Sequence, residues 1–343
     1  MTKLFVGIDV SKDTLDVAVL SSESKEIIEQ FIVDNSKSGI NHLLKQLRKL
    51  ADPDQAWICF EHTGAYCMLL RIMLDKKELC YSVVPALQIK RSMGMVRGSN
   101  DKIDAKRIAW YAMRFQDQLP KSKLPPEELI ELSMLWAQRN HLVRNRTSHK
   151  NLLKGLRSQP KTDRIKKQVN QEKEMIEIYD DRVKDCEAEM ETVISERQEL
   201  QTNYQLIQSI KGIGPITATL LLVTTENFTR FSGNARKFNC YAGLAPFSKQ
   251  SGTSVQTQHQ VSTLRNKSIK TLLYSCAHSA IRFNKEMKTY ADRKLKEGKY
   301  KQKVVNAVAA KLISRVFAII RRQSPFTNIY QQNFQQHLEV SQS

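Results

Sequence analysis

The chain opens with the apolar run Leu4-Phe5-Val6-Gly7-Ile8-Asp9-Val10, which is followed by the polar turn Ser11-Lys12-Asp13 and by a second apolar run from Leu15 to Leu20. These runs predict two strands joined as a hairpin, because they are short, rich in β-branched residues and separated by a turn. Asp9 lies near the end of the first strand, where an unpaired carboxylate is costly to bury. Something must compensate its charge, and a divalent metal ion is one candidate.

The segment that follows alternates between helix and strand. A third strand is expected near 27–33, and a helix follows it because apolar residues recur every three or four positions from Ile40 to Leu50. Trp57 to Phe60 is then expected to be a buried strand, 68–74 a helix and 80–84 a further strand. Three strands followed by alternating helix and strand predict an α/β unit, a mixed sheet with helices on its faces.

The sequence changes character after Pro125, where long helices poor in glycine are expected. One helix is predicted over 126–157, and Gln159-Pro160 can end it. A second helical stretch carries apolar residues at alternating spacings of three and four, the a/d pattern of a coiled coil, with Arg197 as its one charged member. A helical hairpin projecting from the body is the simplest arrangement. The a/d residues are Ile176, Tyr179, Val183, Cys186, Met190, Val193, Arg197, Leu200, Tyr204 and Ile207.

Charge divides sharply within this hairpin. Residues 141–170 hold nine Lys or Arg and one acid, whereas 171–200 hold four basic and eleven acidic residues. The basic segment is a candidate surface for nucleic-acid phosphates, and the acidic segment is expected to point away from them. An alternative stays open, in which the two arms only pair with each other electrostatically.

The last third of the chain is expected to be mainly helical. Lys211-Gly212-Ile213-Gly214-Pro215 lies between apolar helices and resembles a helix-hairpin-helix motif, whose backbone N–H groups can hold a DNA phosphate. A plain helix turn is the alternative. Residues 243–253 are expected to form a flexible turn that presents Ser248 and Ser251. A basic tract over 282–303, before an apolar-faced helix at 304–320, either binds a nucleic-acid backbone or serves as a solubilising face.

Composition excludes several classes of protein. The 343 residues suffice for two or three domains, and 54 Lys and Arg against 35 Asp and Glu give a formal net charge of +19. This balance is unusual for an enzyme of small neutral metabolites and favours a polyanionic partner. The apolar runs are far shorter than the roughly 18 to 20 residues that span a bilayer, and the start lacks the features of a signal peptide. We expect a cytoplasmic protein with free cysteines and no membrane contact.

Four carboxylates are candidate metal ligands. Two of them end apolar strands, and two lie three residues apart, so a helix capped by Asn100 or Ser99 places that pair on one face. An oxygen-rich set of this kind suits Mg²⁺ or Mn²⁺, and two such ions about 4 Å apart can activate a nucleophile and stabilise the leaving oxygen at a phosphodiester. Asp13 and Asp16, in or just after the first turn, are expected to be ordinary solvated residues. The candidate ligands are Asp9, Glu61, Asp101 and Asp104.

A nucleophile is harder to assign from the residues alone. Ser248 and Ser251 lie among basic and polar residues, and a serine attacks phosphate only when its proton is removed or its oxygen polarised, which a nearby metal ion can do. His62 adjoins Glu61 and either assists the carboxylates or makes a structural hydrogen bond. The chain has no G-x-x-x-x-G-K-[ST] phosphate loop, so an ATP-driven mechanism is unsupported.

Five motifs, in this order along nearly the whole chain, resemble those of the DEDD-type insertion-sequence transposases. These are the bridge-RNA-guided serine recombinases that also include the Piv-type DNA invertases. The motifs are Gly7-Ile8-Asp9-Val10-Ser11-Lys12, Glu61-His62-Thr63-Gly64-Ala65-Tyr66, Asp101-Lys102-Ile103-Asp104-Ala105, Gly212-Ile213-Gly214-Pro215, and the stretch from Tyr241-Ala242-Gly243-Leu244-Ala245-Pro246 to Ser251-Gly252.

The resemblance implies an RNA-guided DNA recombinase of a prokaryotic insertion sequence, associated with the nucleoid when it is bound to DNA. In it, the four acids would form an Mg²⁺-binding tetrad, and Ser251 would attack the DNA phosphate to give a covalent phosphoserine link. The implied partners are donor and target double-stranded DNA, a structured noncoding bridge RNA, and copies of the chain that form homodimers and then homotetramers. The implied domains are a RuvC-like RNase H fold over 1–120, a coiled-coil hairpin for dimerisation and nucleic-acid contact over 121–205, a transposase domain over 206–330, and a tail over 331–343.

Two positions depart from the family pattern, and two rival functions remain. Ser251-Gly252-Thr253 stands where the family often has Ser-Gly-Gly, and Thr263-Leu264-Arg265-Asn266 replaces a usual Lys-Arg-Gly-Asn run, which bears on the phosphate contacts of Arg265. Ser248 is a weaker alternative nucleophile. The main rival is a metal-dependent Holliday-junction-type nuclease that uses water, for which Ser251 is dispensable. A non-catalytic nucleic-acid-binding protein is the other, and the presence of all four acids at their motif positions argues against it.

Overall fold

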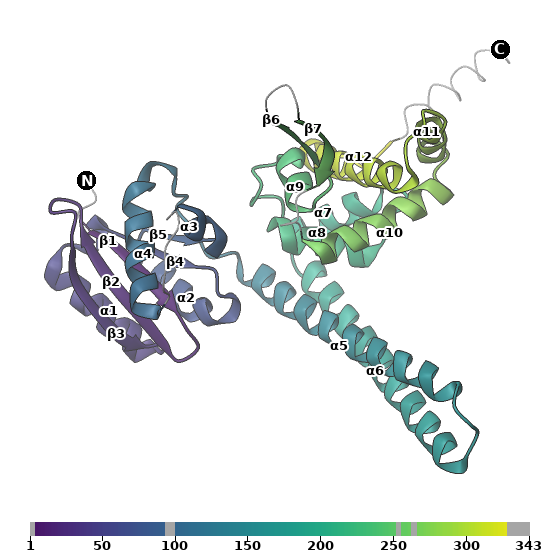
Figure 1. The fold of residues 1–343 in the computed structure, drawn as a ribbon, viewed down its shortest axis with the longest axis horizontal. Helices are drawn as coiled ribbons and strands as arrows, with labels where there is room; N and C mark the ends of the chain where they lie inside the picture. The colour runs from purple at the N-terminus through teal and green to yellow at the C-terminus, as the bar shows by residue number, and fades with distance from the viewer. Residues whose placement is uncertain (1–3, 93–99, 252–254, 262–265, 328–343) are drawn as a thin grey trace. The chain divides into compact units, whose positions relative to one another are not determined.

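The chain divides into two compact units, the first ending at Leu124 and the second beginning at Pro125. Figure 1 shows the helices and strands of each unit in the computed structural model. Within the described residues, no helix is both long enough and apolar enough to cross a membrane. The described residues are 4–92, 100–251, 255–261 and 266–327.

The first unit is built on a five-stranded mixed sheet. Its strands are β1 (Leu4–Val10), β2 (Thr14–Ser21), β3 (Ile27–Asp34), β4 (Ala56–Glu61) and β5 (Tyr81–Val84). They lie in the order β3-β2-β1-β4-β5. The first three strands pair antiparallel as a meander, and β4 pairs in parallel with both β1 and β5. The predicted hairpin and mixed sheet are therefore confirmed.

Helices pack on both faces of this sheet. They are α1 (Lys37–Leu50), α2 (Met68–Lys76), α3 (Ala86–Ser92) and α4 (Asp101–Arg114). Successive side chains of a strand point to opposite faces, so Val6 and Ile8 of β1 join the apolar core formed with α1 and α2. Phe5 instead joins the core formed with α3 and α4. The alternation also assigns Gly7 and Asp9 to the α4 face.

The second unit begins with two long helices, α5 (Glu127–Arg157) and α6 (Asp163–Ser195), which form the expected hairpin. The expectation that the a/d pattern forms one continuous helix through Ile207 is wrong at one point. α6 ends at Ser195, the backbone of Arg197 is extended, and α7 (Gln198–Gln208) begins as a separate helix. A charged residue in the apolar seam is the local reason, because its side chain is 60% exposed instead of buried between helices.

The a/d residues of α6 pack within the chain. Val183, Cys186 and Met190 are buried in one core together with Leu132 and Leu142 of α5. Because α5 occupies this seam, the heptad pattern no longer argues for a contact between two copies. The dimer and tetramer implied by the family resemblance thus need other support.

In its described residues, the rest of the second unit consists of helices and one β-hairpin. The flexible turn expected over 243–253 is wrong in part, because β6 (Pro246–Ser251) pairs antiparallel with β7 (Val255–Val261). Its sequence has the aromatic Phe247 before the segment 252–254, which contains a glycine, and the β-branched Val255, Thr257 and Val261 after it, which favours a hairpin. The helices are α8 (Pro215–Thr225), α9 (Ala235–Tyr241), α10 (Lys267–Phe283), α11 (Lys285–Lys296) and α12 (Lys301–Arg322).

The turn expected between two helices at these glycines is present, since the segment joins α7 to α8. Gly212 has a φ of 109°, a conformation that favours glycine, and a Cβ there would lie 2.8 Å from the Cβ of Ala280. Gly214 is the N-cap of α8 and its neighbour Pro215 is the first helical residue. The turn is thus held against α10, and its binding of a DNA phosphate stays a prediction.

Candidate active site

Two strand ends bring Asp9 and Glu61 side by side. Ile8 of β1 pairs with Phe60 of β4 in parallel register, so the next residue of each strand lies at the same level and on the same face. Both carboxylates are partly exposed. The sheet therefore places a first pair of acids at the edge of the α4 face, where the parallel strands end.

The second pair comes from the first turn of α4. The Asn100 side chain accepts a hydrogen bond from the Ile103 N–H at 2.8 Å, so this residue is the helix cap, and Ser99 lies outside the described residues. Asp101 and Asp104 follow in the first turn, where the helix dipole favours negative charge. Gln30 of β3 donates to the Lys102 carbonyl at 2.8 Å, which ties this end of α4 to the sheet.

Gly7 allows α4 to lie close to β1. A Cβ at this position would lie 2.2 Å from both the Ala105 carbonyl oxygen and the Ala109 nitrogen. Since any side chain would push the helix away, glycine is required here for the close approach of two backbones. The helix that carries two of the acids is thereby held against the strand that carries Asp9.

Electrostatic coupling shows that the four candidate acids lie near one another. Burial, first, and then the charges of Asp101, Glu61 and Asp104 together raise the pKa of Asp9 to about 6. The pKa of Glu61 is also raised, first by burial and then by Asp104. Carboxylates that repel one another in this way favour a bound cation. The structure therefore gathers the four residues named from the sequence into one cluster.

Asp16 belongs to the same cluster, and the expectation that it is solvated is wrong. It lies in β2 directly opposite Asp9 and is only 5% exposed. Burial raises its pKa, as does the charge of Asp101, while Lys102 lowers it. The strand alternation was the available signal, because Leu15 and Val17 face the other core and so leave Asp16 on the α4 face. By contrast, Asp13 is exposed as expected.

Arg107 is a second residue that the sequence reasoning missed. Its Nη1 donates to Asp104 Oδ1 at 2.6 Å, and its side chain is 19% exposed. The i, i+3 spacing on α4 was the available signal. The guanidinium therefore supplies part of the positive charge that the carboxylate cluster needs.

The chemistry of the cluster suits a divalent cation, but its carboxylate groups are not close enough together to bind one as they stand. All its donors are carboxylate oxygens, the ligands preferred by Mg²⁺ and similar hard ions. Within the described residues, however, no group of three or more His, Cys, Asp or Glu side chains is gathered so that it could hold a metal ion. Metal binding thus requires these side chains to draw closer, and Asp104 to exchange or share its bond with Arg107.

The neighbouring His62 does not take part in the cluster as it stands. Its side chain is exposed, and its backbone N–H donates to the Val84 carbonyl at 3.1 Å, which continues the pairing of β4 with β5. This bond fixes the end of the strand after Glu61. A catalytic role for the imidazole therefore stays a prediction.

The candidate nucleophiles lie in the second unit. Ser248 and Ser251 are both in β6, and Ser251 pairs with Val255 at the end of the hairpin. Asn266 caps α10 by accepting a hydrogen bond from the Ile269 N–H at 3.1 Å. Gly252, Thr253, Thr263, Leu264 and Arg265, which carry the departures from the family pattern, lie outside the described residues.

Two family models match the chain, and together they cover more than half of it. A transposase model for the DEDD domain of IS110 matches residues 6–159, and the model described as transposase IS116/IS110/IS902 family matches residues 204–292. The first match includes all four acids and the second includes Ser251.

Relatives of this chain include two gene-inverting proteins and a protein of an insertion element. The pilin gene-inverting protein of Moraxella lacunata is 26% identical over 336 residues, which cover 95% of this chain and 98% of that protein. The pilin gene-inverting protein of Moraxella bovis gives the same identity and coverage. An uncharacterized 43.6 kDa protein of insertion element IS110 from Streptomyces coelicolor is 34% identical over 116 residues, 34% of this chain and 28% of that protein.

A carboxylate cluster on a mixed sheet, joined to a basic helical unit in a chain with these matches, defines an enzyme that cleaves and rejoins DNA. The chain belongs to the IS110 family of insertion-sequence transposases. Its DEDD-type domain implies dependence on a divalent metal ion.

Proposed function

We propose that the chain transposes an insertion sequence by cutting and rejoining donor and target DNA through a covalent phosphoserine at Ser251. Asp9, Glu61, Asp101 and Asp104 would hold Mg²⁺, or Mn²⁺ in its place. The observation that carries the metal site is that Asp9 and Glu61 follow paired residues of two parallel strands, with the first turn of α4, which holds Asp101 and Asp104, packed against β1 at Gly7. The pKa of Asp9, raised to about 6 by burial and by the other acids, agrees with this placement. Four carboxylates from three separate elements are brought together at a cost in repulsion that a divalent cation would relieve.

The chemistry is an exchange of phosphodiester bonds. Ser251 Oγ would form a bond to phosphorus while the bond from phosphorus to one deoxyribose oxygen breaks, and that oxygen takes up a proton as the serine loses one. A bound Mg²⁺ would polarise the attacking hydroxyl and stabilise the charge of the leaving oxygen. A hydroxyl of the other DNA strand then attacks the phosphoserine, reforms a DNA phosphodiester and frees the serine. Since each bond broken is replaced by one of the same kind, the reaction needs no ATP.

The proposal extends to domains and partners. We assign 1–120 to a RuvC-like catalytic domain, 121–205 to the hairpin, 206–330 to the transposase domain and 331–343 to a tail. A structured noncoding bridge RNA would select donor and target DNA by base pairing, within a homotetramer built from dimers. Support for the RNA and the tetramer is the order of the five sequence motifs, and the net charge of +19 supports a nucleic-acid partner in general.

The test is the detection of a protein–DNA adduct. Purified protein is combined with Mg²⁺, RNA transcribed from the flank of its gene, and labelled donor and target DNA, and denaturing gels then reveal any linked species. The wild type and Ser248→Ala should form the adduct, whereas Ser251→Ala should lose it together with rejoined DNA. Cleavage that persists in Ser251→Ala would identify the rival nuclease that uses water. Loss in Ser248→Ala alone would move the nucleophile to that serine.

A further inference from the structure

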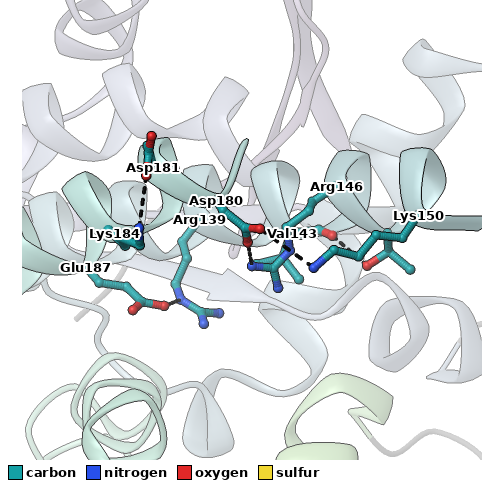
Figure 2. Close-up of polar contacts among 9 residues, drawn as sticks. Arg139, Val143, Arg146, Lys150, Asp180, Asp181, Lys184 and Glu187 are labelled. Atoms are coloured by element: carbon teal, nitrogen blue, oxygen red, sulfur yellow. Dashed lines mark hydrogen bonds and ion pairs between the residues drawn. The ribbon is translucent and has the colours of Figure 1, made fainter. Parts of the chain in front are cut away.

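The helical hairpin has two halves that differ in how their charges are paired. In the half near the body of the second unit, basic residues of α5 meet acids of α6, as Figure 2 shows. Arg139 binds Glu187 at 2.6 Å, and Asp180 pairs with Arg146 at 2.5 Å and with Lys150 at 3.8 Å. The electrostatic pairing of the two arms, left open by the sequence, is therefore present in this half.

The outer half has too few acids for the same arrangement. Residues 150–177, which include every residue that lines the hollow between the two helices, hold eight Lys or Arg and four acids. Two of these acids already have partners, because Glu172 binds His149 at 2.7 Å and Asp163 binds Lys166 at 2.9 Å. Across the described chain, which includes all of this segment, no ion pair is found for Lys154, Arg157, Lys161, Arg164, Lys167 or Lys173. The end of the hairpin thus presents uncompensated positive charge.

Three of these cations line the hollow between the two helices. The hollow has a volume of about 430 Å³, and its apolar floor is formed by Leu153 and Ile176. Exposed Lys154, Arg157 and Lys173 line it with Lys150, and Glu177 is the one acid in its wall. A groove with an apolar floor and cationic edges fits a sugar–phosphate backbone, whose sugars are less polar than its phosphates.

We infer that this outer half of the hairpin, residues 150–177, binds the phosphate backbone of double-stranded DNA. The inference rests on the proposed function, because it is the transposition reaction that brings duplex DNA to the protein. Duplex DNA carries about one negative charge per 1.7 Å of helix axis. The two helices can therefore set several of their cations against consecutive phosphates, without reading bases, so this contact would be independent of sequence.

The test is the salt dependence of duplex binding by the full chain, with matched charge changes. Lys154→Gln/Arg157→Gln removes two cations of the hollow, and the control Arg182→Gln/Lys184→Gln removes two exposed cations of α6 outside it. We expect the first variant to lower the slope of log K against log salt by about 1.8, at about 0.9 per phosphate. Its binding at 0.1 M salt should weaken about tenfold or more, and the control should keep the wild-type slope.

Measurement in EDTA separates this inference from the catalytic proposal, because binding is then observed without any chemistry. Circular dichroism checks that both variants keep their helices. Equal slopes in the two variants would overturn the inference, since net charge alone would then explain the binding. A slope change seen only with an RNA duplex of the same sequence would overturn it as well, because the surface would then serve RNA.

Discussion

Substitution of Gly7 by alanine should separate the two layers that form the carboxylate cluster. The new Cβ would lie 2.2 Å from backbone atoms of Ala105 and Ala109, and ordinary contact begins at 3.4 Å. α4 must therefore move by about 1.2 Å, and neither backbone atom can rotate away. Overpacking of this kind costs roughly 1–3 kcal/mol, which lowers the Tm of a unit of this size by about 4–12 °C. A shift of about 1 Å in catalytic groups can reduce a rate about 100-fold.

Two assays check this prediction, thermal unfolding followed by circular dichroism and cleavage of donor DNA with Mg²⁺. The control is Lys45→Ala, at an exposed position of α1, which packs on the face of the sheet opposite α4 and lies outside the carboxylate cluster. We expect Gly7→Ala to lose both stability and cleavage and the control to lose neither. Wild-type Tm and cleavage in Gly7→Ala would refute the reasoning.

Three further variants test other parts of the structure. Because the pKa of Asp9 is raised to about 6 in the folded protein, its contribution to stability is full below about pH 4 and is lost as the pH rises through 6. The Tm of metal-free protein should fall over that range, and Asp9→Asn should make the fall smaller, because the raised pKa values of Glu61 and Asp16 still contribute to it. Arg107→Gln should bind Mn²⁺ several-fold more tightly in calorimetry, since a competing cation has gone, and weaker binding would contradict this. Met190→Ala, at a side chain only 1% exposed, should cost about 2–5 kcal/mol in urea unfolding.

Much of the fold could be predicted from local patterns in the sequence. The runs of β1 and β2 are short and β-branched, the helices have apolar residues every three or four positions, and Asn100 is a strong cap signal. The four tetrad acids were identifiable because each stands at the end of a strand or at the start of a helix. These signals need only a few neighbouring residues, so they can be read without knowledge of tertiary contacts.

The features that were missed depend on pairing between distant segments. Asp16 is buried because its strand register places it opposite Asp9, and a turn position alone does not reveal that. The heptad pattern correctly predicted which residues of α6 form its apolar seam. It did not determine which helix packs against that seam, and in the structure this is α5 of the same chain. The break at Arg197 follows from a single charged residue in that seam. These features depend on tertiary contacts between segments that are far apart in the sequence, and local patterns do not reveal those contacts.

The central claim is that the four clustered acids perform the DNA chemistry together with a divalent metal ion. The most direct test is cleavage of donor DNA by four amide variants, Asp9→Asn, Glu61→Gln, Asp101→Asn and Asp104→Asn. Asp13→Asn, at an exposed position outside the cluster, is the control. We predict that the cleavage rate of each of the four variants falls about 100-fold or more. The control should cleave DNA at the wild-type rate, and EDTA should abolish its cleavage because the chelator removes the metal ion. Wild-type cleavage by any one of the four would contradict the claim for that residue, and metal-independent cleavage would contradict it altogether.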